Sequence, residues 1–452
     1  MNGKKSSLHL YKADHDPRAA ALVALTQTLR AGADSQAALD GVLSSAVLMP
    51  TDKRLCTEIT YGTLRWYLRL KEFSEGFLSR PDKLPDEMRL TLVTALYEMA
   101  FLRVPHHGPV GWAVKHVANR FGKGLSGVAN GALRSMQRDL KDFHSPDLPL
   151  ATRYAMPEWL ITLWMTSYGE TATLALLEAS QSVPPSGLRL NRAKPGWEEL
   201  RGSLLRENAD SAQAVGSSAL AFHGPLSWQA RELIKEGRAS RQSAASYEAL
   251  EAFSPTLWPQ PLWDCCAGRG GKTLALLEQG IPVALASDPS AHRLEGLGKE
   301  YARLGLTVPP CPPVLAVAAD AADGKGAALV RSDLPDSLDA ILPSAFGTIL
   351  VDAPCSGLGT LARHPEIRLR RTPKDLDTLA ATQRRILEAV WPRLCSGGQL
   401  IYLTCTLNPA ENQDQITAFA ATHPDAIHKG EFHTPFDSPL GEFFYGAMLE
   451  KG

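Results

Sequence analysis

The sequence predicts a multi-domain chain with an all-α front segment, a small α+β segment and an α/β segment with a mostly parallel sheet. Apolar residues recur at helical spacing through the first third, and after about residue 238 runs rich in Val, Ile and Leu alternate with helical stretches. A chain of 452 residues has room for several hydrophobic cores. We predict domains at 1–143, 144–237 and 238–452.

The front segment has the pattern of a helical domain. Residues 19–29, 90–102 and 110–118 carry apolar side chains at helical spacing, and breaks rich in Pro, Gly or polar residues separate them. The stretch 144–149 (HSPDLP) predicts a linker. Beyond it, helical patterns mix with short strands such as residues 186–191, which predicts a small α+β domain.

The rear segment has the pattern of a buried parallel sheet with helices on both faces. The first strand is expected to end at Asp264. Four further strands are expected within apolar runs that Gly, Pro or Asp bounds, namely 283–288, 314–318, 348–352 and 399–404. The segments between them are long enough for crossover helices. Residues 321–344, rich in Ala, Gly and Asp, predict an insertion before the strand at 348–352.

Composition excludes several classes of protein. A charged fraction of 21% is that of ordinary globular chains, and no run of 18 apolar residues is present to span a bilayer as a helix. The N-terminus lacks the apolar stretch of a secretory signal. Seven cysteines without a CxxC pair argue against a disulfide framework and a zinc site. We therefore expect a cytoplasmic protein without metal or membrane contact, and a monomer.

The formal net charge of −1 conceals an uneven distribution of charge. Residues 1–143 carry 20 Lys+Arg and 14 Asp+Glu, a balance of +6, whereas residues 238–452 carry 19 and 24. A basic helical module joined to an acidic rear segment is typical of a domain that delivers RNA to an enzyme, although solvated faces produce the same asymmetry.

A glycine-rich turn follows the first strand of the rear segment. Residues 264–273 (DCCAGRGGKT) lead into a helical stretch, and glycines there allow a ligand to approach the N–H groups at the start of the helix. The turn lacks GxGxxG spacing. It is also not a Walker loop, because Cys266 stands where that motif needs Gly.

Acidic residues follow three successive strands. Asp288, Asp320 and Asp352 would meet at the carboxyl edge of a doubly wound sheet, where ligands bind. An acid after the second strand can accept hydrogen bonds from ribose hydroxyls, and an acid after the third can bind an adenine amino group. Either Asp320 or Asp323 can be that third acid. Together with the glycine turn, these acids predict a site for an adenosine-containing cofactor.

Two cysteines lie in the loops that follow the last two strands. Cys355 occurs in residues 352–360 (DAPCSGLGT), and Cys405 in residues 402–413 (YLTCTLNPAENQ). Adjacent parallel strands would bring both thiols to the edge that holds the cofactor. A free thiol is only about 3% thiolate at pH 7, so a nucleophilic cysteine needs activation by its surroundings.

These motifs resemble the NOL1/NOP2/Sun family of RNA 5-methylcytosine methyltransferases. Residues 264–273 are similar to the family's D-x-C-A-A-P-G-G-K-T, and the runs 352–360, 363–368 (RHPEIR) and 402–413 match its most specific motifs. Residues 63–65 and 127–134 resemble the NusB-type helical RNA-binding fold that the bacterial 16S rRNA enzymes of the family carry. The resemblance implies a Rossmann-like catalytic domain that uses S-adenosylmethionine.

The resemblance also implies roles for individual residues. Cys405 would add to carbon 6 of cytosine, Cys355 would assist product release, and Asp352 would bind the base edge or the cofactor. The cofactor-binding residues would be Cys266, Ala267, Gly268, Arg269, Gly270, Gly271, Lys272, Asp288, Arg293, Asp320 and Asp352. The partner would be RNA, most directly rRNA.

The sequence departs from the family pattern at several positions. Arg269 replaces a proline of the cofactor loop, Thr406 and Gln413 replace Ser and Glu, and residues 241–246 (RQSAAS) stand where many members have Gln-Asp. A tRNA or different rRNA target within the same family, or a non-catalytic RNA-binding assembly factor, are the alternatives. A dinucleotide dehydrogenase is disfavoured by the missing GxGxxG and by the two strand-end cysteines.

Overall fold

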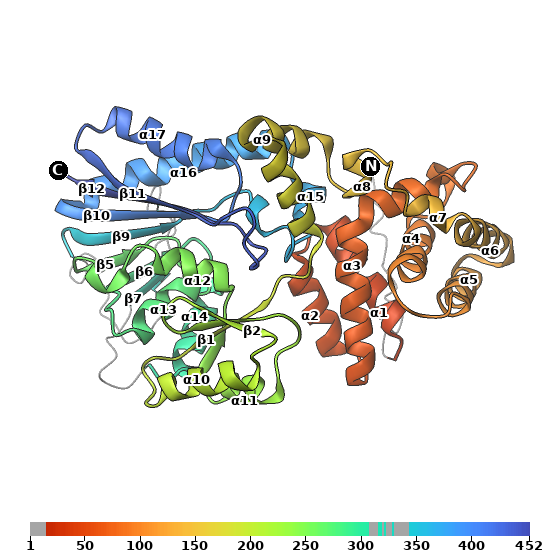
Figure 1. The fold of residues 1–452 in the computed structure, drawn as a ribbon, viewed down its shortest axis with the longest axis horizontal. Coiled ribbons are helices and arrows are strands. Elements are labelled where there is room, and N and C mark those ends of the chain that lie inside the picture. Colours follow the sequence, from red (N-terminus) through yellow and green to blue (C-terminus); the bar gives the residue numbers. More distant parts are fainter. Residues whose placement is uncertain (1–14, 307–314, 319–320, 322–327, 330–342) are drawn as a thin grey trace. The chain divides into compact units, whose positions relative to one another are not determined.

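The computed structural model describes residues 15–306, 315–318, 321, 328–329 and 343–452 (Figure 1). They form two compact units. The first comprises residues up to Leu163 together with His364–Arg370, and the second comprises Trp164–Arg363 and Arg371–Gly452. Of the residues discussed above, Asp320, Asp323 and most of the expected insertion at 321–344 lie outside the described residues.

The first unit is all helical, as the sequence predicts. Its helices are α1 (Pro17–Ala31), α2 (Ser35–Ser45), α3 (Pro50–Glu75), α4 (Asp86–Phe101), α5 (His107–Phe121), α6 (Lys123–Arg138), α7 (Leu140–Phe143), α8 (Leu150–Arg153) and, from the later segment, α15 (Ile367–Arg370). Asp16 and Asp34 accept hydrogen bonds from the first amides of α1 and α2, which fixes where these helices begin. Leu92, Leu96 and Val117 are among the buried side chains that join α4 and α5 in one core.

Helix α9 (Glu158–Gln181) connects the units in sequence and is interrupted at Gly169, whose φ of 78° is not helical. A four-stranded antiparallel sheet of order β2-β3-β1-β4 follows, made of β1 (Ser186–Leu190), β2 (Ala212–Val215), β3 (Ala219–Phe222) and β4 (Ala239–Arg241). Helices α10 (Trp197–Glu207) and α11 (Trp228–Lys235) accompany it. The predicted α+β character is confirmed. The boundary after residue 237 stays a proposal, and β4 lies just beyond it.

The larger sheet of the second unit has the order β11-β12-β10-β9-β5-β6-β7-β8. Its strands are β5 (Leu262–Asp264), β6 (Leu285–Asp288), β7 (Leu315–Ala318), β8 (Ala328–Leu329), β9 (Phe346–Asp352), β10 (Leu394–Thr404), β11 (Ala426–His433) and β12 (Tyr445–Lys451). The five central strands, in the order β10-β9-β5-β6-β7, are parallel. The strands β8, β12 and β11 at the two edges pair antiparallel. The expected mostly parallel, Rossmann-like sheet is confirmed.

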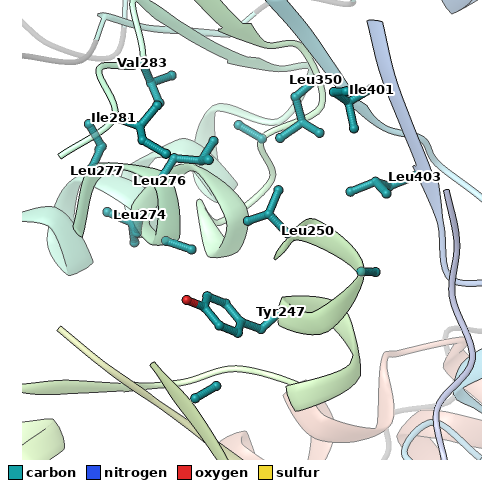
Figure 2. Packing of buried hydrophobic residues seen from close by; sticks show 14 of the residues in the cluster. Tyr247, Leu250, Leu274, Leu276, Leu277, Ile281, Val283, Leu350, Ile401 and Leu403 are labelled. Carbon is teal, nitrogen blue, oxygen red and sulfur yellow. The ribbon is translucent and has the colours of Figure 1, made fainter. Parts of the chain in front are cut away.

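Helices cover both faces of this sheet, as Figure 1 shows. The helices α12 (Ala244–Glu251), α13 (Gly271–Glu278) and α14 (Ala291–Arg303) lie on one side, and α16 (Pro373–Val390) and α17 (Gln413–Thr422) lie on the other. Leu350, Ile401 and Leu403 join the core on the α12–α13 face (Figure 2). Their neighbours Val351 and Leu400 join the opposite core, because successive side chains of a strand point to opposite faces.

The sheet order reverses at β5, which lies between β9 and β6. At such a reversal the loops leave the sheet in opposite directions, and a crevice opens at the carboxyl ends of the strands. The glycine turn follows β5, and the loop of Cys355 follows β9. The topology therefore assembles the motifs found in the sequence at one edge of the sheet. Within the described part of the chain, no helix is long and apolar enough to cross a membrane.

A buried ion pair joins the small sheet to the helix that follows the glycine turn. Arg189 on β1 donates from Nε and Nη2 to the two carboxylate oxygens of Glu278 on α13, at 2.6 and 2.8 Å. Both side chains are at most 2% exposed. Nη1 of Arg189 also donates to the backbone oxygen of Gly271, at 2.9 Å. The arginine therefore fixes both ends of α13.

Replacement of Arg189 by Met should strongly destabilise this junction, because Glu278 would be left buried without its partner. We expect the free energy of local opening of α13 to fall by about 3–5 kcal/mol, measured by hydrogen–deuterium exchange. The double variant Arg189→Met/Glu278→Leu is the control and should recover most of the loss. Exchange in α13 that is unchanged in Arg189→Met would contradict a stabilising role for the pair.

Candidate active site

The structure brings Cys355 and Cys405 together. β9 and β10 are parallel, with Asp352 paired to Leu403, so each cysteine lies just past the carboxyl end of its strand. The two Sγ atoms are 3.2 Å apart, and the amide of Cys405 donates to Sγ of Cys355 at 3.3 Å. Both are free thiols and partly exposed. Two sulfur atoms at this separation can share one proton and can reach the same ligand atom.

A buried carboxylate holds the two cysteine loops together. Oε2 of Glu411 accepts from the amide of Ser356 at 2.8 Å and from Nε2 of Gln383 at 2.9 Å. Oε1 accepts from Nδ2 of Asn408 at 3.0 Å. Glu411 is fully buried, and Tyr402 donates to its backbone oxygen at 2.8 Å. Because its partners come from both loops and from α16, Glu411 holds the loop of Cys355 in place relative to the loop of Cys405.

Two further contacts tie the same loops. Ser356 and Thr406 share a hydroxyl hydrogen bond of 2.5 Å, so the Thr that departs from the family pattern keeps a hydroxyl at this position. Gly359 donates to the backbone oxygen of Cys405 at 3.0 Å and accepts from the amide of Phe443 at 2.8 Å. A Cβ on Gly359 would lie 2.0 Å from the oxygen of Phe443, so only glycine fits between these segments.

The surroundings of Cys405 keep its thiol protonated. The hydrogen bond with Cys355 and burial raise the pKa of Cys405 well above its usual range, and the negative charge of Asp352 acts in the same direction. Lys272 opposes them. The structure therefore places one cation where it can favour the thiolate form of Cys405.

Lys272 and Asp352 form an ion pair beside the cysteines. Nζ of Lys272 lies 2.6 Å from Oδ2 of Asp352, and the lysine is 7% exposed while Asp352 is about one-third exposed. The ammonium also faces the ring of Phe444, 5.8 Å from its centroid. The lysine holds the carboxylate in place, and the exposed part of Asp352 remains able to accept a hydrogen bond from a ligand.

The glycine turn runs from β5 into α13 along the end of β6. The amide of Ala267 donates to the backbone oxygen of Ser287 at 2.9 Å, and the amide of Gly268 donates to Oδ2 of Asp288 at 3.1 Å. Gly270 has φ of +83°, and a Cβ there would lie 2.6 Å from the side chain of Leu297. This backbone and packing require glycine at position 270.

The remaining residues of the turn face different surroundings. Cys266 is partly exposed and lies 3.9 Å from the sulfur of Cys265. Arg269, which replaces the family's proline, is exposed, and its side chain lies beside Gly296 of α14. Gly271 is exposed at the start of α13. A Cβ at Gly271 would meet only Nε2 of Gln242, at 3.8 Å, so the turn is open on that side.

Asp288 ends β6 and is 4% exposed. Its two oxygens accept from the amides of Gly268 and Ser290, at 3.1 and 2.8 Å, and each keeps a lone pair free. Nη1 of Arg293 is 3.7 Å from Oδ2 of Asp288, while most of the arginine side chain is exposed. Asp320, expected to complete this set, lies outside the described residues.

Asp264, the last residue of β5, is hydrogen-bonded to the helix that follows the glycine turn. Oγ1 of Thr273 donates to its Oδ2 at 2.5 Å, and no described group hydrogen-bonds its buried Oδ1. Burial raises the pKa of Asp264 to about 7, against the opposing hydrogen bond from Thr273. The carboxyl group is thus a structural link between β5 and α13.

Sequence reasoning missed the connecting residues of this site. Glu411 occurs in the quoted run 402–413, but its partners Ser356 and Gln383 are 55 and 28 residues away, so spacing gives no sign of the contact. The pairing of Lys272 with Asp352 was likewise not predicted. The burial of Glu411 cannot be read from the sequence, so its Pro- and Asn-rich loop gave no signal for these contacts.

One group of possible metal ligands lies elsewhere, in the first unit. Asp34, His364 and Glu366 have ligand atoms within 4.8 Å of one another. Oε2 of Glu366 accepts from Oγ of Ser35 at 2.8 Å, at the first residue of α2. These contacts explain Glu366 as part of a helix start.

The parallel sheet, the glycine turn and the strand-end acids form a Rossmann-like arrangement, and comparison with known proteins identifies it as that of a methyltransferase. Three family models match the chain: NusB family at residues 15–138, a ferredoxin-like domain of RsmF/B-like methyltransferases at 156–229, and 16S rRNA methyltransferase RsmB/F at 257–442. The chain belongs to the RsmB/F family of methyltransferases. The family resemblance found in the sequence is confirmed.

Relatives match the chain over nearly its whole length. Ribosomal RNA small subunit methyltransferase B of Vibrio cholerae is 32% identical over 446 residues, covering 96% of this chain and 97% of its own. The protein of the same name from Shewanella oneidensis is 30% identical over 414 residues, covering 88% and 91%. The crystal structure of PH0851 is similar with a TM-score of 0.71 at 22% identity, covering 96% of this chain and 99% of its own, which supports the fold.

The raised pKa of Cys405 predicts slow alkylation at neutral pH. Because the thiolate reacts, the rate of Cys405 modification by iodoacetamide should rise about tenfold per pH unit between pH 7 and 9. Replacing Cys355 by Ala removes the largest cause of the raised pKa and should shift this curve to lower pH. Mass spectrometry of both cysteines, with Cys395 as internal reference, provides the measurement. A plateau below pH 8 in the wild-type protein would contradict the assignment.

Proposed function

We propose that this enzyme methylates carbon 5 of cytosine in RNA, most directly in 16S rRNA, with S-adenosylmethionine as methyl donor. The observation that supports this most is the 3.2 Å approach of Cys355 and Cys405 beside the Lys272–Asp352 pair. Carbon 5 of cytosine is a poor nucleophile, and a thiolate that adds to carbon 6 makes it reactive. The names of the relatives, which specify small-subunit ribosomal RNA, support the choice of RNA.

The residues of the glycine turn fit S-adenosylmethionine. Asp288 keeps lone pairs free for ribose hydroxyls, and the side of the turn at Gly271 is open to a ligand. Residues 266–272, Asp288, Arg293 and Asp352 would hold the cofactor, and Asp320 remains part of the proposed set. When bound, S-adenosylmethionine supplies a methyl group made electrophilic by its sulfonium. The carboxylates of Asp288 and Asp352 suit a cationic ligand.

Cys405 is the proposed nucleophile. Its proton passes to Asp352, whose charge acts on Cys405. The thiolate then forms a bond to carbon 6, and the displaced electron pair makes carbon 5 nucleophilic. Asp352, held by Lys272, accepts a hydrogen bond from the N4 amino group of the base. Once it has taken the proton of Cys405 it donates to N3, which neutralises the negative charge that develops on the ring. After methylation, a base removes the proton on carbon 5, the double bond re-forms and Cys405 departs as thiolate. Cys355, 3.2 Å away, assists this release by returning a proton to Cys405.

The helical first unit is proposed to hold the RNA. A base within a stack cannot reach Cys405, and turning it out costs a few kcal/mol, least for a loop nucleotide. The balance of +6 over residues 1–143 attracts RNA and helps to offset this cost. The domains 1–143, 144–237 and 238–452, and a cytoplasmic location, remain part of the proposal.

Complementation of a deletion strain tests the whole proposal. Wild-type protein should restore a 5-methylcytosine in 16S rRNA, detected by bisulfite sequencing of total RNA, and Cys405→Ala should not, because carbon 5 is no longer activated. Purified Cys405→Ala should still bind S-adenosylmethionine in calorimetry with unchanged affinity.

Residual turnover of Cys405→Ala within tenfold of wild type would exclude Cys405 as the nucleophile. A 5-methylcytosine restored in tRNA and not in 16S rRNA would show that the substrate is tRNA. Absence of binding heat in the wild-type protein would favour a non-catalytic RNA-binding factor.

A further inference from the structure

A cationic pocket lies between the small sheet and the catalytic part of the second unit. Its volume is about 430 Å³, and three arginines line it: Arg231 from α11, Arg241 from the end of β4, and Arg363 from the loop after Cys355. No Asp or Glu is among the lining residues. Gln242 and Ser243 add polar groups. The pocket therefore suits an anion.

Two of these arginines have no counter-ion among the residues that the structure describes. Arg363 is neutralised, because Nε and Nη2 donate to the carboxylate oxygens of buried Glu442 at 3.0 and 2.6 Å. The side chains of Arg231 and Arg241 are exposed and make no hydrogen bond or ion pair with any residue that the structure describes. Two unpaired guanidinium groups around one pocket give it a net positive charge available to a ligand.

An exposed tryptophan accompanies the pocket. Trp228 is 70% exposed and lies three residues before Arg231 on α11, so both side chains occupy the same face of the helix. A tryptophan this exposed gains nothing from burial in the protein. Aromatic surfaces beside unpaired arginines are the elements with which proteins bind single-stranded RNA, the aromatic ring stacking on a base and the arginines binding phosphates.

A short chain of contacts joins this pocket to Cys405. Arg363 and Ser243 both donate to Glu442, the serine at 2.9 Å. The next residue, Phe443, donates from its amide to Gly359, which in turn donates to the backbone oxygen of Cys405. The wall of the pocket is thus connected to the loop of Cys405 through Glu442, Phe443 and Gly359.

We propose that this pocket binds a phosphodiester of the substrate RNA strand beside the target cytidine, through Arg231 and Arg241, while a neighbouring base stacks on Trp228. The proposal rests on the proposed RNA substrate. It assigns to the small α+β domain a role in holding the single-stranded segment, in addition to the general attraction of the basic first unit.

Variants of the pocket test this role on the full-length protein with a 16S rRNA transcript as probe. Arg231→Ala/Arg241→Ala should raise the KM for RNA about tenfold, with kcat at saturating RNA within twofold of wild type. The slope of log binding constant against log salt should fall by about 0.7 for each arginine. Trp228→Ala should raise the RNA KM about tenfold and Trp228→Phe should restore it, because the phenylalanine ring still stacks.

The matched control is Arg206→Ala, which removes an exposed arginine of α10 that does not line the pocket. It should leave KM and salt slope unchanged. The proposal would be overturned if the double arginine variant had a KM for RNA within twofold of the wild-type value and a salt slope within about 0.3 of the wild-type slope. The proposal would also be overturned if Arg206→Ala changed KM and salt slope as much as the double arginine variant does.

These results separate the pocket from the proposed chemistry. If the wild-type protein methylates no RNA, the proposed function is refuted. The proposed role of the pocket is tested separately, by RNA binding alone. Loss of RNA affinity in the double arginine variant supports the pocket even then. Methylation that survives with unchanged RNA binding in that variant refutes the pocket and leaves the function intact.

Discussion

The parallel pairing of β9 with β10 is the constraint on which the site depends. Because Asp352 is paired with Leu403, the loops that leave the two strands start at the same level, and their cysteines meet at 3.2 Å. A shift of one residue in this register would move each side chain to the opposite face of the sheet. Glu411 then fixes the loops beyond the strands through three side-chain hydrogen bonds. The pairing of β9 with β10 sets the position of the two thiols, and the buried side chain of Glu411 keeps their loops in that position.

The electrostatics of the site follow from this closeness. Two thiols in contact cannot both ionise easily, and their hydrogen bond with burial keeps Cys405 protonated at rest. Lys272 is the nearby cation that favours the thiolate, but it is paired with Asp352. Arrival of a cationic ligand near Asp352 would leave Lys272 less neutralised and Cys405 easier to ionise. In the proposed mechanism, a cationic ligand bound near Asp352 would therefore favour ionisation of Cys405.

Much of the fold could be predicted from local sequence pattern. Apolar runs gave the parallel strands, because strands buried on both faces are apolar throughout, and Asp288 and Asp352 marked where two of them end. The small sheet was predicted only in outline, since β4 has three residues and pairs with β1 about 50 residues earlier. Local pattern carries no information on such pairings, nor on Glu411 and Lys272, whose partners the tertiary fold supplies. The departures at Thr406 and Arg269 are explained by the structure: one keeps a hydroxyl, and the other lies exposed beside α14.

In the proposed reaction, Cys405 forms the bond to the base and Cys355 assists its release. Incubating the Cys355→Ala variant with unmethylated 16S rRNA and S-adenosylmethionine tests it most directly, followed by nuclease and protease digestion and mass spectrometry. We predict a denaturation-resistant adduct in which one methylated cytidine is attached to the peptide that contains Cys405. Absence of any adduct, or attachment to another residue, would contradict it.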